Sequence, residues 1–86
     1  MRHKFNTSDL RHPGAHWAEV VDEAGKDRAQ VCKATRIPPL RLDLILDREE
    51  LPTASEVLSL AHELRVSPRL MWHLQADWTL SQAEES

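Results

Sequence analysis

Glycine and cysteine are scarce in this chain, and no long apolar run occurs in it. Two glycines among 86 residues, with five prolines, argue against a turn-rich β fold, as does the lack of short alternating strands at regular spacing. The single cysteine, Cys32, cannot form an intrachain disulfide. No segment is apolar enough to span a bilayer, and the N-terminal residues do not have a signal-peptide pattern. We therefore expect one small cytoplasmic domain that makes no contact with a membrane.

Enzymatic chemistry and metal binding are not expected either. The five histidines do not have the spacing of a known metal site, and no cysteine or carboxylate accompanies them at ligand spacing. The sequence has no serine elbow, no phosphate-binding glycine loop and no convincing pair of nucleophile and base. We expect Cys32 to be packed rather than reactive. The sequence therefore predicts a protein that is not an enzyme and that uses neither a metal nor a cofactor.

Charge is distributed unevenly along the sequence. The net charge of −3 is unfavourable for a simple nucleic-acid binder. Residues 26–48, however, carry six basic side chains against three aspartates, whereas residues 49–86 carry two arginines against seven acidic residues. The basic segment is where a DNA backbone could be met. The alternative is a solvated surface on which charges cluster by chance.

Residues 27–48 predict two short helices joined by a tight corner. Asp27 and Gln30 have the spacing of a capping box, which begins the first helix. A corner follows at residues 35–37, and Pro39 with the proline before it opens a second helix, because proline fits the first helical turn. Two short helices with a turn of this length form a helix-turn-helix unit, whose second helix usually enters the DNA major groove.

The second helix of this unit has two interpretations. A strand is the competing one, because leucines at 40, 42 and 44 alternate with charged residues. That alternation breaks at residues 44–46, and both flanks have helical signals, so we favour a helix. At about 100° per residue, Leu42, Ile45 and Leu46 would then pack into the domain.

The outward side of the same helix is poor in groups that read DNA. It would carry Leu40, Asp43, Leu44 and Asp47, with two prolines at its tip. Reading helices normally offer Arg, Lys, Asn, Gln, Ser or Thr to base edges and phosphates. Only Arg41 lies near the tip as a candidate donor, so we expect DNA binding that is weak and has little selectivity.

Three further helices complete an all-α prediction. They span about residues 15–24, 54–64 and 68 onward, and the second of them begins with another capping box at Thr53 and Glu56. The predicted organisation is a flexible arm at 1–11, a helix-turn-helix domain at 12–80, and a frayed acidic tail at 81–86. The residues expected to face inward, outside the second helix of the unit, are Trp17, Val20, Val21, Ala24, Val31, Ala34, Val57, Leu58, Ala61, Leu64, Leu70, Met71, Leu74 and Trp78.

Five short helices in this order describe the lambda-repressor-like architecture, and three motifs resemble one family within it. His-Pro-Gly at residues 12–14 resembles the opening of the HigA-type antitoxins, also called the VapI group. Val-Ser-Pro at 66–68 stands where that family turns into its last helix. Residues 72–80 resemble the family's W-x-x-L-Q-x-x-Y-D-L ending, shortened by one residue. The resemblance covers residues 12–80.

This resemblance implies an antitoxin of a type II toxin-antitoxin pair. Such a protein would bind and neutralise a small RelE-type ribonuclease toxin and repress its own operon as a homodimer on double-stranded operator DNA. The residues then expected at the DNA are Arg28, Lys33, Arg36, Pro39, Leu40, Arg41, Asp43, Leu44 and Arg48. The residues expected at the dimer interface are Leu70, Trp72, Leu74 and Trp78.

The departures from the family pattern concern the corners and the reading positions. Arg36 and Arg65 stand where the family usually has glycine, at corners that often need a positive φ. Arginine in that conformation costs on the order of 1 kcal/mol. The Asn-Gly that follows the family's reading helix is replaced by Asp47 and Arg48. Two alternatives therefore stay open. One is a stand-alone transcription regulator of the same fold, and the other is a protein-interaction module that uses Leu40 and Leu44.

Overall fold

The computed structural model describes residues 11–85, which contain five α-helices and no strand. The helices are α1 (Pro13–Glu23), α2 (Arg28–Thr35), α3 (Pro39–Leu46), α4 (Ala54–Leu64) and α5 (Pro68–Glu85). The all-α prediction is confirmed, and the competing strand at residues 40–46 is wrong. The predicted flexible arm, apart from Arg11, lies outside the described residues, as does Ser86.

Capping side chains begin α2 and α4 where the sequence predicted them, and a further one begins α5. At the start of α2, Asp27 accepts a hydrogen bond from the backbone of Gln30 at 2.8 Å, and the Gln30 side chain accepts one from the Asp27 backbone at 2.9 Å. Thr53 and Glu56 form the same reciprocal pair before α4. The Ser67 hydroxyl accepts from the backbone of Leu70 at the start of α5. These local signals were sufficient because each cap joins residues three apart.

The His-Pro-Gly motif begins α1 two residues earlier than predicted. His12 is the N-cap, and its Nδ1 accepts from the backbone of Gly14 at 2.9 Å, while Pro13 occupies the first helical turn. Gly14 lies directly against α3: a Cβ on it would lie 2.0 Å from the carbonyl oxygen of Ile45. The motif therefore both starts a helix and allows two backbones to approach closely.

The core contains most, but not all, of the predicted inward residues. Leu42, Ile45 and Leu46 are buried, as predicted for α3. Ala24 and Ala34 are exposed, because the first caps the end of α1 and the second faces away from the core. In α4 the prediction chose the wrong leucine, since Leu58 is 60% exposed. The core residues of that helix are Val57, Leu60, Ala61 and Leu64.

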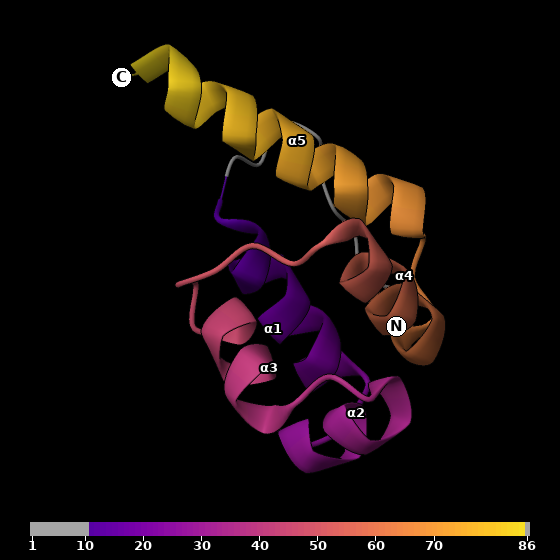
Figure 1. Ribbon diagram of the computed structural model, residues 1–86. Helices are drawn as coiled ribbons and strands as arrows, with labels where there is room; N and C mark the ends of the chain where they lie inside the picture. The colour runs from indigo at the N-terminus through magenta and orange to yellow at the C-terminus, as the bar shows by residue number, and fades with distance from the viewer. Residues whose placement is uncertain (1–10, 86) are drawn as a thin grey trace.

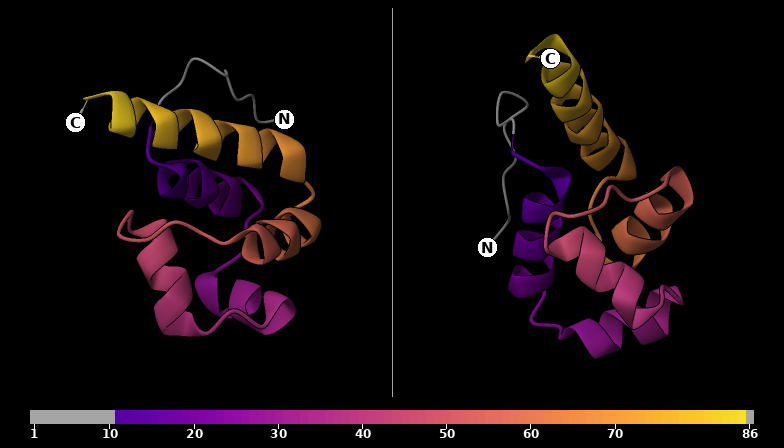
Figure 2. Two further views of the ribbon diagram at one scale, coloured as in Figure 1. Left: turned by 45° about the horizontal axis from the view of Figure 1, so that its top comes forward. Right: turned by 60° about the vertical axis from the view of Figure 1, so that its left-hand side comes forward.

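The five helices place the α2–α3 unit and α5 at opposite ends of the molecule (Figures 1 and 2). Helix α1 lies between them and contacts both α3 and α5, and α4 contacts α2 and α5. Helix α5 continues to Glu85, through the residues for which a frayed tail was predicted. That segment contains no glycine or proline, and its Ala, Gln and Glu residues favour helix.

Three arginines adopt the left-handed backbone conformation. Arg36 caps the end of α2 with φ 65°, and Arg65 caps the end of α4 with φ 60°, as the comparison with the family's glycines suggested. Arg48, just after α3, also has φ 65°. Because a Cβ is disfavoured there, each position stores conformational strain on the order of 1 kcal/mol.

Candidate functional site: the α2–α3 unit

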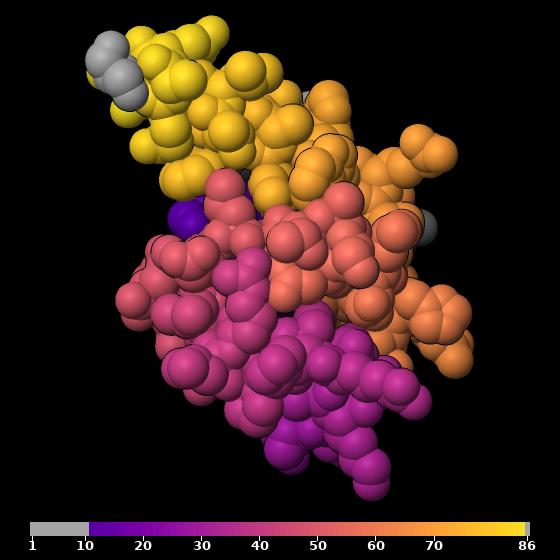
Figure 3. All heavy atoms as spheres, viewed as in Figure 1, coloured from indigo at the N-terminus to yellow at the C-terminus, as the bar shows by residue number. Residues whose placement is uncertain are grey.

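The corner between α2 and α3 is fixed by local hydrogen bonds and by one buried side chain. Residues 36–38 connect the two eight-residue helices. The Thr35 hydroxyl donates to the carbonyl of Val31 at 2.7 Å and accepts from the backbone of Ile37 at 3.3 Å. The Ile37 side chain is buried in the core. The angle between the two helices is therefore set by the corner, and α3 is presented at the end of the molecule that lies away from α5 (Figure 3).

The outward side of α3 is apolar at its tip and acidic further along. Leu40 is 73% exposed, and Pro39 beside it is also exposed. Leu44 is partly buried, and the side chains of Asp43 and Asp47 are about half exposed. Within the described residues, this side of α3 does not present a side-chain donor of its own to solvent. The outward side of α3 therefore consists of the apolar and acidic residues that the sequence predicted there.

Arg28 joins both aspartates of α3 to the start of α2. One guanidinium nitrogen donates to Asp43 at 2.7 Å, and the other donates to Asp47 at 3.0 Å. These hydrogen bonds, with that to Asp47 the larger cause, raise the pKa of Arg28 above its ordinary value. The sequence predicted Arg28 and Asp43 as separate DNA contacts, whereas the structure brings these two residues together with Asp47 in one cluster.

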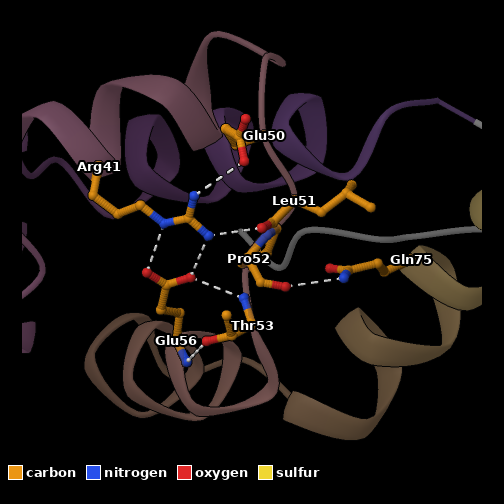
Figure 4. Close-up of polar contacts among 7 residues, drawn as sticks. All are labelled: Arg41, Glu50, Leu51, Pro52, Thr53, Glu56 and Gln75. Atoms are coloured by element: carbon orange, nitrogen blue, oxygen red, sulfur yellow. Dashed lines mark hydrogen bonds and ion pairs between the residues drawn. The ribbon is translucent and has the colours of Figure 1, made fainter.

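Arg41 extends from α3 toward α4 and forms a second, less exposed cluster (Figure 4). Its Nε and one terminal nitrogen each donate to Glu56 at 2.8 Å, and the same terminal nitrogen donates to the carbonyl of Leu51 at 2.8 Å. The other terminal nitrogen lies 3.4 Å from Glu50. The Arg41 side chain is 26% exposed. The structure therefore places it at the connection between α3 and α4 and not on the outward side of α3.

The electrostatics of this second cluster favour the ionised pair. The hydrogen bond from Arg41 is the largest cause that lowers the pKa of Glu56 below its ordinary value, and the Thr53 backbone contributes in the same direction. Gln75 of α5 donates to the carbonyl of Pro52 at 3.0 Å (Figure 4). The connection between α3 and α4 is consequently held from both α3 and α5.

The remaining basic residues of the predicted DNA surface lie outside both arginine clusters. Lys33, Arg36 and Arg48 are exposed, and no ion pair involves them within residues 11–85. Arg36 lies beside α4, where it lines a hollow with Leu58. Arg48 lies beside the start of α1, and its backbone is 3.3 Å from the place of a Gly14 Cβ. Arg36 and Arg48 therefore lie beside different helices, α4 and α1.

His12 lies near Arg48, at the start of α1. Burial is the main cause that lowers the pKa of His12, and the charge of Arg48 adds to it. Cys32, on the buried side of α2, packs against the core, and burial raises the pKa of its thiol. Among residues 11–85, no three His, Cys, Asp or Glu side chains are grouped in a way that could hold a metal ion.

The predicted dimer residues occupy different environments in α5. Leu74 is buried in the core, and Leu70 is partly buried against it. Trp78 is half-buried, with its ring 4.8 Å from the ring of His12. Trp72 is 43% exposed and lines a groove of about 510 Å³ between α4 and α5. Of the four, only Trp72 presents a large exposed surface.

The sequence interpretation missed a second apolar row on α5. Leu80 is 63% exposed, and Ala76, which is also exposed, lies midway between it and Trp72. Residues four apart lie on one side of a helix, so this row could have been found from spacing alone. It was missed because the same helix also has a buried row, and only one row was expected.

Comparisons with protein-family models, curated proteins and solved structures found no match to this chain. Within residues 11–85, no helix combines the length and apolar character that crossing a membrane requires. A functional assignment therefore depends on the sequence motifs and on the geometry of the α2–α3 unit.

Proposed function

We propose that this chain is a HigA-like antitoxin with a lambda-repressor-like helix-turn-helix domain. It binds and neutralises a RelE-type ribonuclease toxin in the cytoplasm and represses its own operon as a homodimer. The observation that carries the proposal is the α2–α3 unit, with its fixed corner and an α3 whose tip, at Pro39 and Leu40, is exposed to solvent. The resemblance of residues 12–14, 66–68 and 72–80 to the family adds the antitoxin role.

In this proposal α3 enters the major groove with its tip first. Leu40 contacts thymine methyl groups, and Lys33, Arg36 and Arg48 approach phosphates from the edges of the unit. Arg41 makes no contact with bases, because its guanidinium is bound to Glu56 and to the carbonyl of Leu51. Since the contacts are mainly to phosphate, binding is salt-sensitive and only weakly selective.

A pair of glycine substitutions tests the DNA contact. Arg36→Gly and Arg65→Gly each remove one cation, and each relieves the strain of an arginine in the left-handed backbone conformation. Both therefore raise the free energy of unfolding by about 1 kcal/mol. Only Arg36 belongs to the α2–α3 unit. Fluorescence anisotropy with a promoter duplex at two salt concentrations should show weaker binding for Arg36→Gly, with a salt slope reduced by about 0.9. Arg65→Gly should bind as the parent does.

Two results would contradict this part of the proposal. Equal loss of affinity in both variants would mean that net charge, and not the α2–α3 unit, governs binding. Failure of the parent to bind any duplex at low salt would remove DNA binding altogether.

The homodimer is proposed to form through the exposed row of α5. Trp72, Ala76 and Leu80 would meet their copies across a two-fold axis, because such an axis brings the same patch of both subunits together. Leu80→Asp should lower the molar mass measured by light scattering to that of a monomer. Leu40→Asp alters a leucine of similar exposure on α3 and should leave the mass unchanged. A parent that is monomeric at micromolar concentration would refute this interface.

The toxin partner is tested by co-expression with the reading frame adjacent to the gene. The proposal expects a stable complex and rescue of growth from a toxic neighbour. A neighbour that is neither bound nor neutralised would exclude the antitoxin role and leave the stand-alone regulator.

One observation favours a second candidate, the protein-interaction module. Leu40 is 73% exposed, and no free donor stands beside it on α3. This candidate predicts no salt-sensitive binding to duplex DNA by the parent, together with loss of a protein partner in Leu40→Asp.

A further inference from the structure

The two aspartates on α3 conflict with a surface that approaches DNA. Asp43 and Asp47 lie one helical turn apart and are both about half exposed. Unpaired, they would bring two negative charges to the phosphates and oppose association. Arg28 is hydrogen-bonded to both, so the cluster has a net charge of −1 instead of −2.

Local helix stability does not account for these charges. Arg28 is the first residue of α2, where the helix dipole disfavours a cation. Asp47 caps the end of α3, where the dipole disfavours an anion. Each charge is thus unfavourable in its own helix, and each is compensated only by its partner on the other helix.

The geometry also fixes where the carboxylates point. A planar guanidinium donates in a rigid fork, so one arginine can hold two carboxylates that lie on adjacent turns. With both hydrogen bonds made, the aspartates are turned toward α2, and the groove-facing side of α3 keeps Leu40 as its main contact.

We propose that Arg28 is an internal counter-ion that makes α3 compatible with the phosphate backbone, and that it is not itself a phosphate contact. It acts through Asp43 and Asp47 as a positioning residue. This inference rests on the proposed DNA binding and specifies how the same surface is regulated by its own charges. It assigns Arg28 a role opposite to the one that its charge alone suggested.

The test is a rescue experiment on a promoter duplex at low salt. Arg28→Ala should weaken binding by on the order of tenfold, because both carboxylates are then uncompensated. Adding Asp43→Asn and Asp47→Asn to Arg28→Ala should restore affinity to that of the parent or better. Asp43→Asn with Asp47→Asn introduced into the parent gives the reference for this rescue. A counter-ion role predicts that these two substitutions strengthen binding less in the parent than in Arg28→Ala, because the carboxylates of the parent are already compensated. A direct phosphate contact predicts an equal gain in both backgrounds.

A charge-matched control separates this local effect from net charge. Arg28→Ala combined with Glu84→Gln and Glu85→Gln removes two carboxylates from the far end of α5 and should remain as weak as Arg28→Ala alone. Melting temperatures of all variants establish that each is folded at the temperature of the titration.

The outcomes distinguish this inference from the function on which it rests. A parent that binds no duplex overturns the proposed DNA binding and this role with it. A parent that binds, with a triple variant as weak as Arg28→Ala, overturns only the counter-ion role and makes Arg28 a direct contact. Rescue by the distant control would likewise overturn it.

Discussion

The inward and outward sides of α3 differ in what holds them. Inward, Leu42, Ile45 and Leu46 are buried, and the backbone of Gly14 lies directly against Ile45. Outward, a half-exposed ion cluster is the main interaction. The inward side therefore determines stability, because close packing and burial contribute far more than exposed ion pairs. The residues on the outward side contribute little to stability, so they can be selected for function.

The two arginine clusters show the same contrast, although both consist of an arginine bound to carboxylates. Arg41 and Arg28 each bind carboxylates, but Arg41 is mostly buried at the connection to α4, whereas Arg28 stays at the surface. Arg41 also binds the carbonyl of Leu51. The environment, and not the residue type, thus makes the first a structural element and leaves the second available to tune a surface.

The largest effect is expected from filling the contact between α1 and α3. Gly14→Ala places a Cβ within 2.0 Å of the Ile45 carbonyl, so the helices must separate, at about 3 kcal/mol in the free energy of unfolding. Gly25→Ala is the control, since its Cβ meets nothing within 4 Å and only its positive φ, 69°, opposes the change. It should cost about 1 kcal/mol. Urea denaturation measures both, and equal values would contradict the close contact.

A smaller effect is expected when the two arginines are removed one at a time. Arg41→Ala leaves the Glu56 carboxylate and the Leu51 carbonyl without their donor and should cost about 2 kcal/mol. Arg28→Ala should cost less than about 1 kcal/mol, because its pairs are exposed to solvent. Urea denaturation at pH 7 compares them. A larger loss for Arg28→Ala would reverse the assignment of structural and surface roles.

The smallest effect is expected in the acid dependence of stability. Because the folded-state pKa of Glu56 lies below its ordinary value of 4.5, its contribution is complete above that value and is lost as the pH falls through the lowered pKa. Denaturation of the parent and Glu56→Gln across pH 7 to 2 should show a stability difference that shrinks on acidification. A difference that does not change with pH would mean that the ion pair does not stabilise the fold.

The sequence was sufficient to predict features that depend on residues close together in the chain. The caps at Asp27 and Thr53 join residues three apart, and the inward side of α3 follows from helical spacing, so both were predicted. Leu60, and not Leu58, completes the i, i+3, i+4, i+7 spacing with Val57, Ala61 and Leu64, so this part of the prediction could have been corrected from the sequence alone.

The candidate site was predicted less well than the fold, for the same reason. Its residues were predicted as a set, but Arg28 meets Asp43 across 15 positions, and Arg41 meets Glu56 across 15. No local rule joins residues so far apart. The charge of each arginine was visible in the sequence, whereas the carboxylates that each arginine binds were not.

The central claim is that the outward side of the α2–α3 unit is the surface that meets DNA. Backbone amide chemical-shift mapping with a promoter duplex tests it most directly. The account predicts that the shifts concentrate between residues 33 and 48, around Lys33, Arg36, Leu40 and Arg48, and that the groove lined by Leu58 and Trp72 is unaffected. Shifts confined to that groove between α4 and α5, or none at any salt concentration, would contradict it.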